Sequence, residues 1–154
     1  MPGIVVIAHQ PLASALERAA RHVFSRDPRC ANYRLQSLDV EPDADLAAVE
    51  QQLRAAVAQI DDGRGVLVLT DCLGATPANV AARVAEAGRV EVLAGANLPM
   101  VLRALCYSDS TLDALAEKAA AGGNRGIVSV GPTPPPDRQT PAQDDDLARL
   151  QDQQ

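Results

Sequence analysis

Short apolar runs alternate with longer amphipathic stretches along most of this chain, and this alternation restricts the fold more than any other feature. Residues 4–8 and 65–70 are mostly aliphatic and β-branched, and they are short enough to be buried strands. Residues 33–40 and 90–94 are the other strands predicted in this series. Strands that alternate with helices favour a parallel sheet with helices on both faces, so we predict the α/β fold class.

The amphipathic stretches predict the helices. Apolar residues at helical spacing predict helices over residues 12–25, 46–60, 77–87, 98–106 and 110–121. Pro11, Pro77 and Pro99 stand in the first turns of three of these helices, where a missing backbone N–H is tolerated. We therefore predict a doubly wound, mainly parallel sheet in the order 2-1-3-4.

The predicted series of strands and helices ends with a glycine-rich segment and a short apolar run. Gly122 and Gly123 are expected to end the last helix, and residues 122–126 are expected to form a flexible connector. Residues 127–130 then predict a short strand, which is stable only when it pairs with a sheet edge. That edge belongs either to its own sheet or to the sheet of a second subunit.

Composition divides the chain into a domain and a tail. The 154 residues correspond to one domain, which we predict over residues 1–131. Residues 132–154 hold five of the eleven prolines and five Asp against two Arg, so they carry −3 of the net charge of −6. Such a segment is predicted to be a disordered tail, because it has little apolar surface to bury. A net negative chain is also a poor ligand for nucleic acid.

The cysteines and the N-terminus bear on the cellular compartment. Cys30, Cys72 and Cys106 form no CxxC pair, which argues against a disulfide framework and a structural zinc site. Residues 4–7 have no basic lead and no long apolar stretch, so neither a signal peptide nor a membrane span is expected. A cytoplasmic location follows by default.

Two reactive side chains follow the first and third predicted strands. In an open parallel sheet, ligands collect at the carboxyl ends of the strands, where His9 and Asp71 stand. In the order 2-1-3-4 these strands are neighbours, and the direction of winding reverses between them. A carboxylate beside a histidine fixes which ring nitrogen holds the proton and leaves the other as a nucleophile. His9 is thus a candidate nucleophile, and Asp71 is the residue that orients it.

The loop after Asp71 predicts an anion site. Gly74 lets the backbone approach a ligand closely, and Ala75 and Thr76 lead into a helix whose N-terminus attracts anions. The Thr76 hydroxyl also fits a helix N-cap. Together with His9, this arrangement indicates phosphoryl transfer. The sequence has no GxxxxGK[ST] motif and no GxGxxG after a strand, so direct use of ATP or a dinucleotide is not expected. We predict no other cofactor and no metal.

Each of these residues also has an ordinary structural interpretation. A histidine at a strand end is often structural, and Asp71 by itself is able to hydrogen-bond its own loop. Thr76 followed by Pro77 is a common helix start on any fold. Cys72 is expected to be a small buried residue, with a reactive thiol as the lesser alternative.

Three motifs in register resemble one known family. The chain is similar to the IIA domains of the mannose class of the bacterial phosphoenolpyruvate-dependent sugar phosphotransferase system. That family has a strand that ends in histidine, an Asp-x-x-Gly-Gly-Ser-Pro-x-Asn loop and a Gly-x-Asn-Leu-Pro-Met turn. The matching residues are 4–9, 70–79 and 95–100, and the agreement extends over about residues 3–131. Ala75 replaces the usual second glycine of the loop, and Thr76 replaces the usual serine.

The resemblance implies a role for each site residue. It implies that His9 accepts phosphate from phospho-HPr, that Asp71 pairs with the imidazole, and that Thr76 stands where the family has a phosphate-contacting serine. It also implies a homodimer in which the last strand crosses to the partner's sheet.

The acceptor that receives the phosphate stays open at this point. Members of the family continue into a IIB domain or act beside IIB, IIC and IID proteins, and the given sequence has no IIB domain. A separate IIB protein is therefore the expected acceptor in sugar transport. The alternatives are a regulatory sensor of phosphoenolpyruvate supply without transport, and a phosphoryl donor subunit for a dihydroxyacetone kinase.

Overall fold

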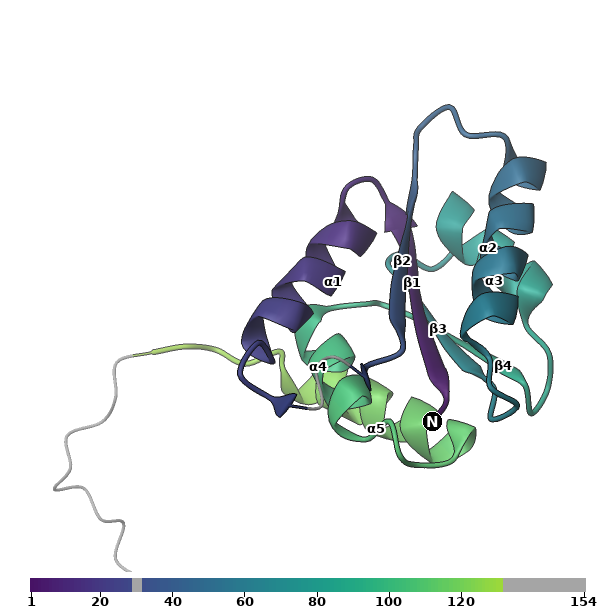
Figure 1. The fold of residues 1–154 in the computed structure, drawn as a ribbon. Coiled ribbons are helices and arrows are strands. Elements are labelled where there is room, and N and C mark those ends of the chain that lie inside the picture. The colour runs from purple at the N-terminus through teal and green to yellow at the C-terminus, as the bar shows by residue number, and fades with distance from the viewer. Residues whose placement is uncertain (29–31, 132–154) are drawn as a thin grey trace, which may run out of the picture.

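The computed structural model describes residues 1–28 and 32–131, which form one parallel sheet and the helices around it (Figure 1). The sheet has the order β2-β1-β3-β4, as the sequence predicts. The strands are β1 (Gly3–His9), β2 (Leu35–Val40), β3 (Val66–Thr70) and β4 (Val90–Ala94). The helices are α1 (Leu12–Val23), α2 (Leu46–Ile60), α3 (Thr76–Val84), α4 (Leu98–Cys106) and α5 (Leu112–Arg125).

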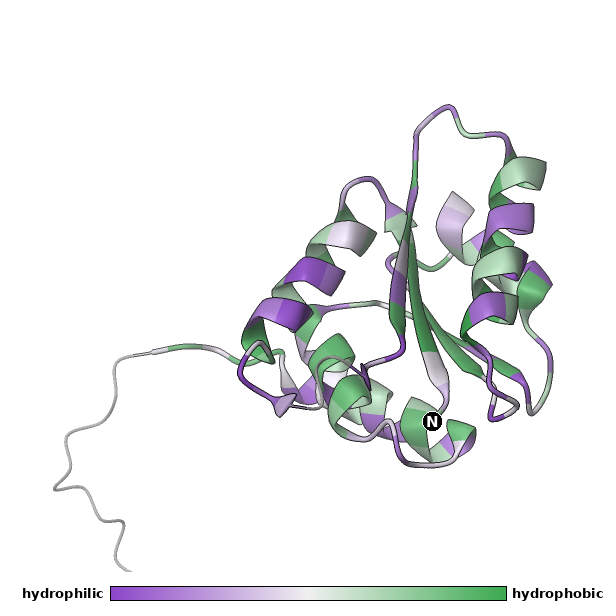
Figure 2. Cartoon of the chain, in the orientation of Figure 1, coloured by the Kyte–Doolittle hydropathy of each residue, from purple (hydrophilic) through white to green (hydrophobic). Residues whose placement is uncertain are grey.

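The sheet lies between two layers of helices. Residues of α1, α4 and α5 pack on one face, and residues of α2 and α3 pack on the other. Alternate side chains of each strand enter the two cores, so Val6 faces the first layer while Val5 and Ile7 face the second. Figure 2 shows the apolar strands at the centre and polar residues along the outer sides of the helices.

The strand order places the candidate nucleophile, His9, at the exposed end of a central strand. β1 lies between β2 and β3, so it is buried from Gly3 to Ala8, and His9 is its first exposed residue. After β1 the chain enters α1 on one face, and after β3 it enters α3 on the other face. The winding therefore reverses between β1 and β3, which is the arrangement that creates a binding crevice in such sheets.

The glycines near the end of α5 do not end the helix, so the predicted flexible connector is wrong. A Cβ atom on Gly122 would lie 2.6 Å from the Cβ of Arg103, and one on Gly123 would lie 3.1 Å from the Cε of Met100. The missing side chains thus allow α5 to pack closely on α4, and the helix continues to Arg125. These glycines are therefore needed because they let two helices approach closely, and not because they make the backbone flexible.

Residues 127–131 form no strand in the described part of the chain, although the sequence predicts one there. The side chains of Ile127 and Val130 are 78% and 92% exposed. Pairing within the chain's own sheet is therefore wrong, whereas exchange with a partner stays a prediction. Cys30 and the predicted tail, 132–154, lie outside the described residues.

The third helix is shorter than predicted. α3 ends at Val84 because the chain then turns back, and the backbone groups of Glu86 and Val90 pair with each other at 3.1 and 2.7 Å. Within residues 1–28 and 32–131, no helix has both the length and the apolar composition to cross a membrane.

Candidate functional site

His9 and Asp71 meet at the carboxyl edge of the sheet. The Nδ1 atom of His9 lies 2.7 Å from the Oδ2 atom of Asp71, and the backbone N–H of His9 donates to the same oxygen at 3.0 Å. This contact follows from the register of the two strands, because β1 and β3 pair with Ile7 beside Thr70. His9, the last residue of β1, and Asp71, the first residue after β3, are therefore neighbours, as the sequence predicts.

Asp71 is held as a charged carboxylate. Its Oδ1 atom accepts the N–H of Cys72 at 2.8 Å, and its side chain is only 11% exposed. Burial by itself would raise the pKa of Asp71, but hydrogen bonds from the backbone and ring of His9 and from the backbone of Cys72 hold it below its usual value. The carboxylate is thus negative at neutral pH and fixed in position on both oxygens.

The imidazole of His9 is oriented by this contact while much of it stays open to solvent. Its side chain is 54% exposed. Because Nδ1 lies against a carboxylate, we assign the ring proton to Nδ1 and the lone pair to Nε2. Nε2 is then the nitrogen that is free to act as a nucleophile.

The loop that follows Asp71 is held by hydrogen bonds within the loop and to the first turn of α3. Gly74 has a φ of +83°, a conformation that favours glycine. The N–H of Ala75 donates to the carbonyl of Cys72 at 3.2 Å, and the side-chain amide of Asn79 donates to the carbonyl of Gly74 at 3.2 Å. The backbone donor of Ala75 is therefore already used, whereas those of Gly74 and Thr76 have no acceptor among the described residues.

The start of α3 differs from the prediction. Ala75 is the N-cap and Thr76 is the first helical residue, so the Thr76 hydroxyl does not cap the helix. Pro77 has no N–H to satisfy, which removes one donor from the first turn. The first turn also contains no acidic residue. The N-terminus of α3 therefore keeps its partial positive charge.

The other helices that begin at this edge are capped. Asp45 accepts an N–H of α2 at 3.0 Å, and Asn97 accepts an N–H of α4 at 2.9 Å. The N-cap of α1 is Pro11, which has no side-chain acceptor, and Asp39 at the end of β2 takes its place by accepting the N–H of Ser14 at 3.0 Å. Among the residues described at this edge, α3 alone begins without such a side-chain acceptor.

Sequence analysis assigns no role to Asp39 or to Thr70. The signal for Asp39 is an aspartate at a strand end combined with a proline at the N-cap of the neighbouring helix. Thr70 is fully buried, and its hydroxyl has no hydrogen-bond partner within residues 1–28 and 32–131. A sequence pattern gives no sign of this, because Thr is common in strands.

The side chains beside the site are exposed, contrary to the prediction for Cys72. The thiol of Cys72 is free and solvent-exposed, and Leu73 is 87% exposed. The prediction of a buried cysteine is wrong because the loop turns outward after Asp71, and only the backbone N–H of Cys72 faces the carboxylate.

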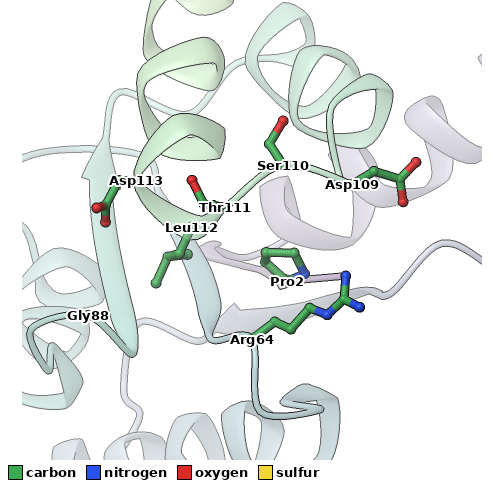
Figure 3. Close-up of a pocket in the computed structure, with 8 residues that line it drawn as sticks. All are labelled: Pro2, Arg64, Gly88, Asp109, Ser110, Thr111, Leu112 and Asp113. Atoms are coloured by element: carbon green, nitrogen blue, oxygen red, sulfur yellow. The ribbon is translucent and has the colours of Figure 1, made fainter.

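One surface cavity lies at the amino edge of the sheet, where Pro2 precedes β1 and Arg64 precedes β3 (Figure 3). It has a volume of about 450 Å³. The residues that line it are Pro2, Arg64, Gly88, Asp109, Ser110, Thr111, Leu112 and Asp113. It lies beside the amino ends of the strands, whereas reactive groups of such sheets collect at the carboxyl ends. We therefore place the candidate site at the His9–Asp71 pair.

The fold and the site together define a class: doubly wound parallel α/β domains with an oriented, exposed histidine where the winding reverses. Within that class, residues 3–120 match the family described as "PTS system fructose IIA component", and the chain belongs to this family. The sequence-based recognition of a IIA domain is thereby confirmed.

Relatives and solved structures agree with this assignment. The mannose-specific EIIAB component of Escherichia coli (strain K12) is 31% identical over 100 residues, which are 63% of this chain and 31% of that protein. The chain thus spans about a third of the length of that relative. The EIIA structure from Streptococcus agalactiae has a TM-score of 0.72 at 24% identity and covers 84% of this chain and 97% of its own.

A second solved structure is similar in extent. The mannose/sorbose-specific IIA subunit from Enterococcus faecalis has a TM-score of 0.71 at 20% identity and covers 84% of this chain and 95% of its own. At these identities the likenesses to the two structures show the fold alone, and the fold class predicted from the sequence is confirmed.

Proposed function

We propose that this protein is a phosphoryl carrier of the sugar phosphotransferase system, which accepts phosphate from phospho-HPr on Nε2 of His9. The observation that carries this proposal is the 2.7 Å contact between Nδ1 of His9 and Oδ2 of Asp71. His9 is oriented by a buried carboxylate and yet remains 54% exposed, so its Nε2 atom is accessible to a phosphoryl donor. Membership of the IIA family supplies the chemical context.

The transfer step uses the Nε2 lone pair. Nε2 attacks the phosphorus atom of the donor phosphohistidine, the donor P–N bond breaks, and its electron pair returns to the donor imidazole. The ring of His9 gains positive character as the new P–N bond forms, while Nδ1 keeps its proton. The carboxylate of Asp71 stabilises that charge without taking the proton, so the pair orients the nucleophile and supports the product.

The phosphoryl oxygens are received at the N-terminus of α3. The backbone donors of Gly74 and Thr76 and the Thr76 hydroxyl are the groups proposed to contact them, whereas the N–H of Ala75 is committed to Cys72. An uncapped helix N-terminus with free N–H groups binds phosphate well. The loops that follow the four strands at this edge, 10–11, 41–45, 71–75 and 95–97, contain no Lys or Arg, so backbone dipoles supply the positive potential.

Labelling tests the proposal. The protein is incubated with phosphoenolpyruvate, enzyme I and HPr, and acid-labile phosphate on the protein is measured. We expect labelling of the natural chain and none of His9→Ala. His22→Ala is the matched control, since His22 is the other histidine and lies in the last turn of α1, and it should label normally. Undiminished labelling of His9→Ala would contradict the assignment.

The expected acceptor of the phosphate is a separate IIB protein. This proposal rests on the family and on the likeness to EIIAB components, in whose name IIA and IIB stand together. Chase of the labelled protein with a purified IIB protein should move the label to IIB. Retention of the label on His9 would favour a regulatory role instead.

A homodimer is part of the proposed assembly. Residues 127–131 expose Ile127, Val128 and Val130, and β4 is an edge strand of the sheet. An exposed apolar segment and an open edge fit strand exchange with a second copy. Light scattering should give a dimer for the intact chain and a monomer or aggregate for a chain cut before Gly126. A monomeric intact chain would contradict the proposal.

A further inference from the structure

Two helix N-termini flank His9, and they differ in charge. α1 begins after only Gln10 and Pro11, and α3 begins after the loop that carries Asp71. The N-terminus of either helix would attract an anion on the histidine ring. The N-terminus of α1 faces the carboxylate of Asp39, whereas that of α3 has neither a cap from a side chain nor an acidic residue in its first turn.

We propose, on the basis of the function above, that Asp39 is a positioning residue for the phosphoryl group. Its carboxylate closes the N-terminus of α1 to anions and fixes the connection between His9 and α1. The phosphoryl group on Nε2 is then stabilised at the N-terminus of α3 and not at that of α1. Asp39 thus acts through α1 and does not itself contact the reacting atoms.

The contacts of Asp39 support this assignment. Strand register places Asp39 beside Ala8, one residue before the nucleophile. Its Oδ1 atom accepts the N–H of Ser14 at 3.0 Å, and the Ser14 hydroxyl donates to the carbonyl of Pro11 at 3.2 Å. The N–H of Gln10 donates to the carbonyl of Val40 at 3.0 Å. The whole turn after His9 is therefore tied to the end of β2.

The charge of Asp39 is the part that a simple cap would not require. Asn97 caps α4 through a neutral amide oxygen, so the fold itself shows that an uncharged acceptor suffices for the hydrogen bond. A carboxylate at the N-terminus of α1 also lowers the attraction of that terminus for a second anion. The N-terminus of α3 has no capping side chain and no acidic residue in its first turn, so it is the better place for a phosphoryl group on His9.

The test separates the hydrogen bond from the charge. Asp39→Asn keeps the acceptor and removes the charge, and Asp39→Ala removes both. Asp43→Asn is the control, because Asp43 is an exposed acid that follows the same strand and makes no hydrogen bond within the described residues. Isotope-labelled protein is titrated with inorganic phosphate while the backbone amides are followed by NMR, and phosphoryl transfer from phospho-HPr is measured as kcat and KM.

In the natural chain and in Asp43→Asn, phosphate should shift the amides of Gly74, Thr76 and Ala78. In Asp39→Asn it should also shift the amides of residues 12–14. Turnover at saturating phospho-HPr should fall about fivefold in Asp39→Asn, in line with the magnitude of a helix-terminus charge effect, with KM unchanged. Asp39→Ala should lose more.

Three results would overturn the proposal. The first is that Asp39→Asn turns over at the natural rate. The second is that phosphate shifts no additional amides at residues 12–14 of Asp39→Asn. The third is an increase in KM shared by Asp39→Asn and Asp43→Asn, since that would make Asp39 a docking charge only. If the natural chain takes no phosphate from phospho-HPr, the proposed function fails, while the phosphate titration still decides which helix Asp39 controls.

Discussion

The two edges of the sheet use their carboxylates in different ways. At the amino edge, Asp61 and Asp62 form ion pairs. Arg89 donates to Asp61 at 3.2 Å, and Asp62 pairs with Arg34 and with the terminal amino group of Met1. The negative charges of Asp61 and Asp62 are thus compensated by positive ones, and these ion pairs join segments that are far apart in the sequence.

At the carboxyl edge, Asp39, Asp45 and Asp71 form no ion pair with a Lys or Arg of the described residues, and they bind backbone N–H groups and one imidazole. Asp39 and Asp45 cap helices, and Asp71 holds His9. The loops that follow the strands there contain no Lys or Arg. Charge at the amino edge therefore stabilises the fold, whereas charge at the carboxyl edge is arranged around a reactive ring. Changes at the two edges should therefore affect different measurements.

The largest effect is expected from Asp71→Asn. The substitution keeps the shape but removes the charge that orients His9, so phosphoryl transfer should slow by on the order of 10²-fold. Transfer of labelled phosphate from phospho-HPr measures this rate. Asp61→Asn, at the other edge, is the control and should transfer at the natural rate. Equal transfer rates in the two variants would contradict a special role for the carboxyl edge in phosphoryl transfer.

The next effect concerns stability at the amino edge. Asp61 accepts the N–H groups of Gly63 and Gly65 at 2.8 and 3.0 Å, and its side chain is only 8% exposed. Asp61→Ala should lower the free energy of unfolding by about 2 kcal/mol, because hydrogen bonds to a charged acceptor are lost. Urea unfolding followed by circular dichroism measures this loss. Phosphorylation of Asp61→Ala should stay at the natural rate at a temperature where the variant is folded. A slower rate under that condition would contradict the prediction.

Both edges contain a carboxylate that should make stability depend on pH, Asp61 at the amino edge and Asp71 at the carboxyl edge. The N–H of Gly63, aided by that of Gly65 and by Arg89, lowers the pKa of Asp61 in the folded state. The pKa of Asp71 is also lowered, because its hydrogen bonds outweigh the opposing effect of burial. In the unfolded chain an Asp has a pKa of about 3.9, so the unfolded state binds more protons at acidic pH.

The stabilisation from both groups is therefore fully present above the unfolded pKa and is lost as pH falls through the folded pKa. Urea midpoints between pH 6 and pH 2 should fall less steeply in Asp61→Asn and in Asp71→Asn than in the natural chain. Only the second variant should also change phosphoryl transfer at neutral pH. An acid slope that is the same in all three proteins would show that neither carboxylate is linked to folding.

The smallest effect is expected from Arg64→Ala in the cavity at the amino edge. The guanidinium of Arg64 forms no ion pair with the described residues, and surface changes of this kind alter stability by no more than about 0.5 kcal/mol. Neither the urea midpoint nor the rate of phosphorylation should change noticeably. A clear loss of phosphorylation would mean that the amino edge takes part in function.

The site could be predicted from the sequence to the extent that it depends on strand order. His9 and Asp71 each follow an apolar run, and once those runs are taken as neighbouring parallel strands, the two residues must meet. The loop 71–76 could be located in the same way. Asp39 could not, because its role depends on a hydrogen bond to Ser14 in a helix that packs beside β2 only in the folded chain.

The alternation of strands and helices, the buried central strands and the residues at their carboxyl ends could be read from the sequence, because periodicity and turn chemistry are local properties. Tertiary contacts were needed to show that Gly122 packs against Arg103 inside a continuous helix and that Cys72 faces solvent. They were also needed to show that α3 begins without a capping side chain, whereas α1 is capped from β2. These outcomes depend on distances between residues far apart in the chain, which no local pattern encodes.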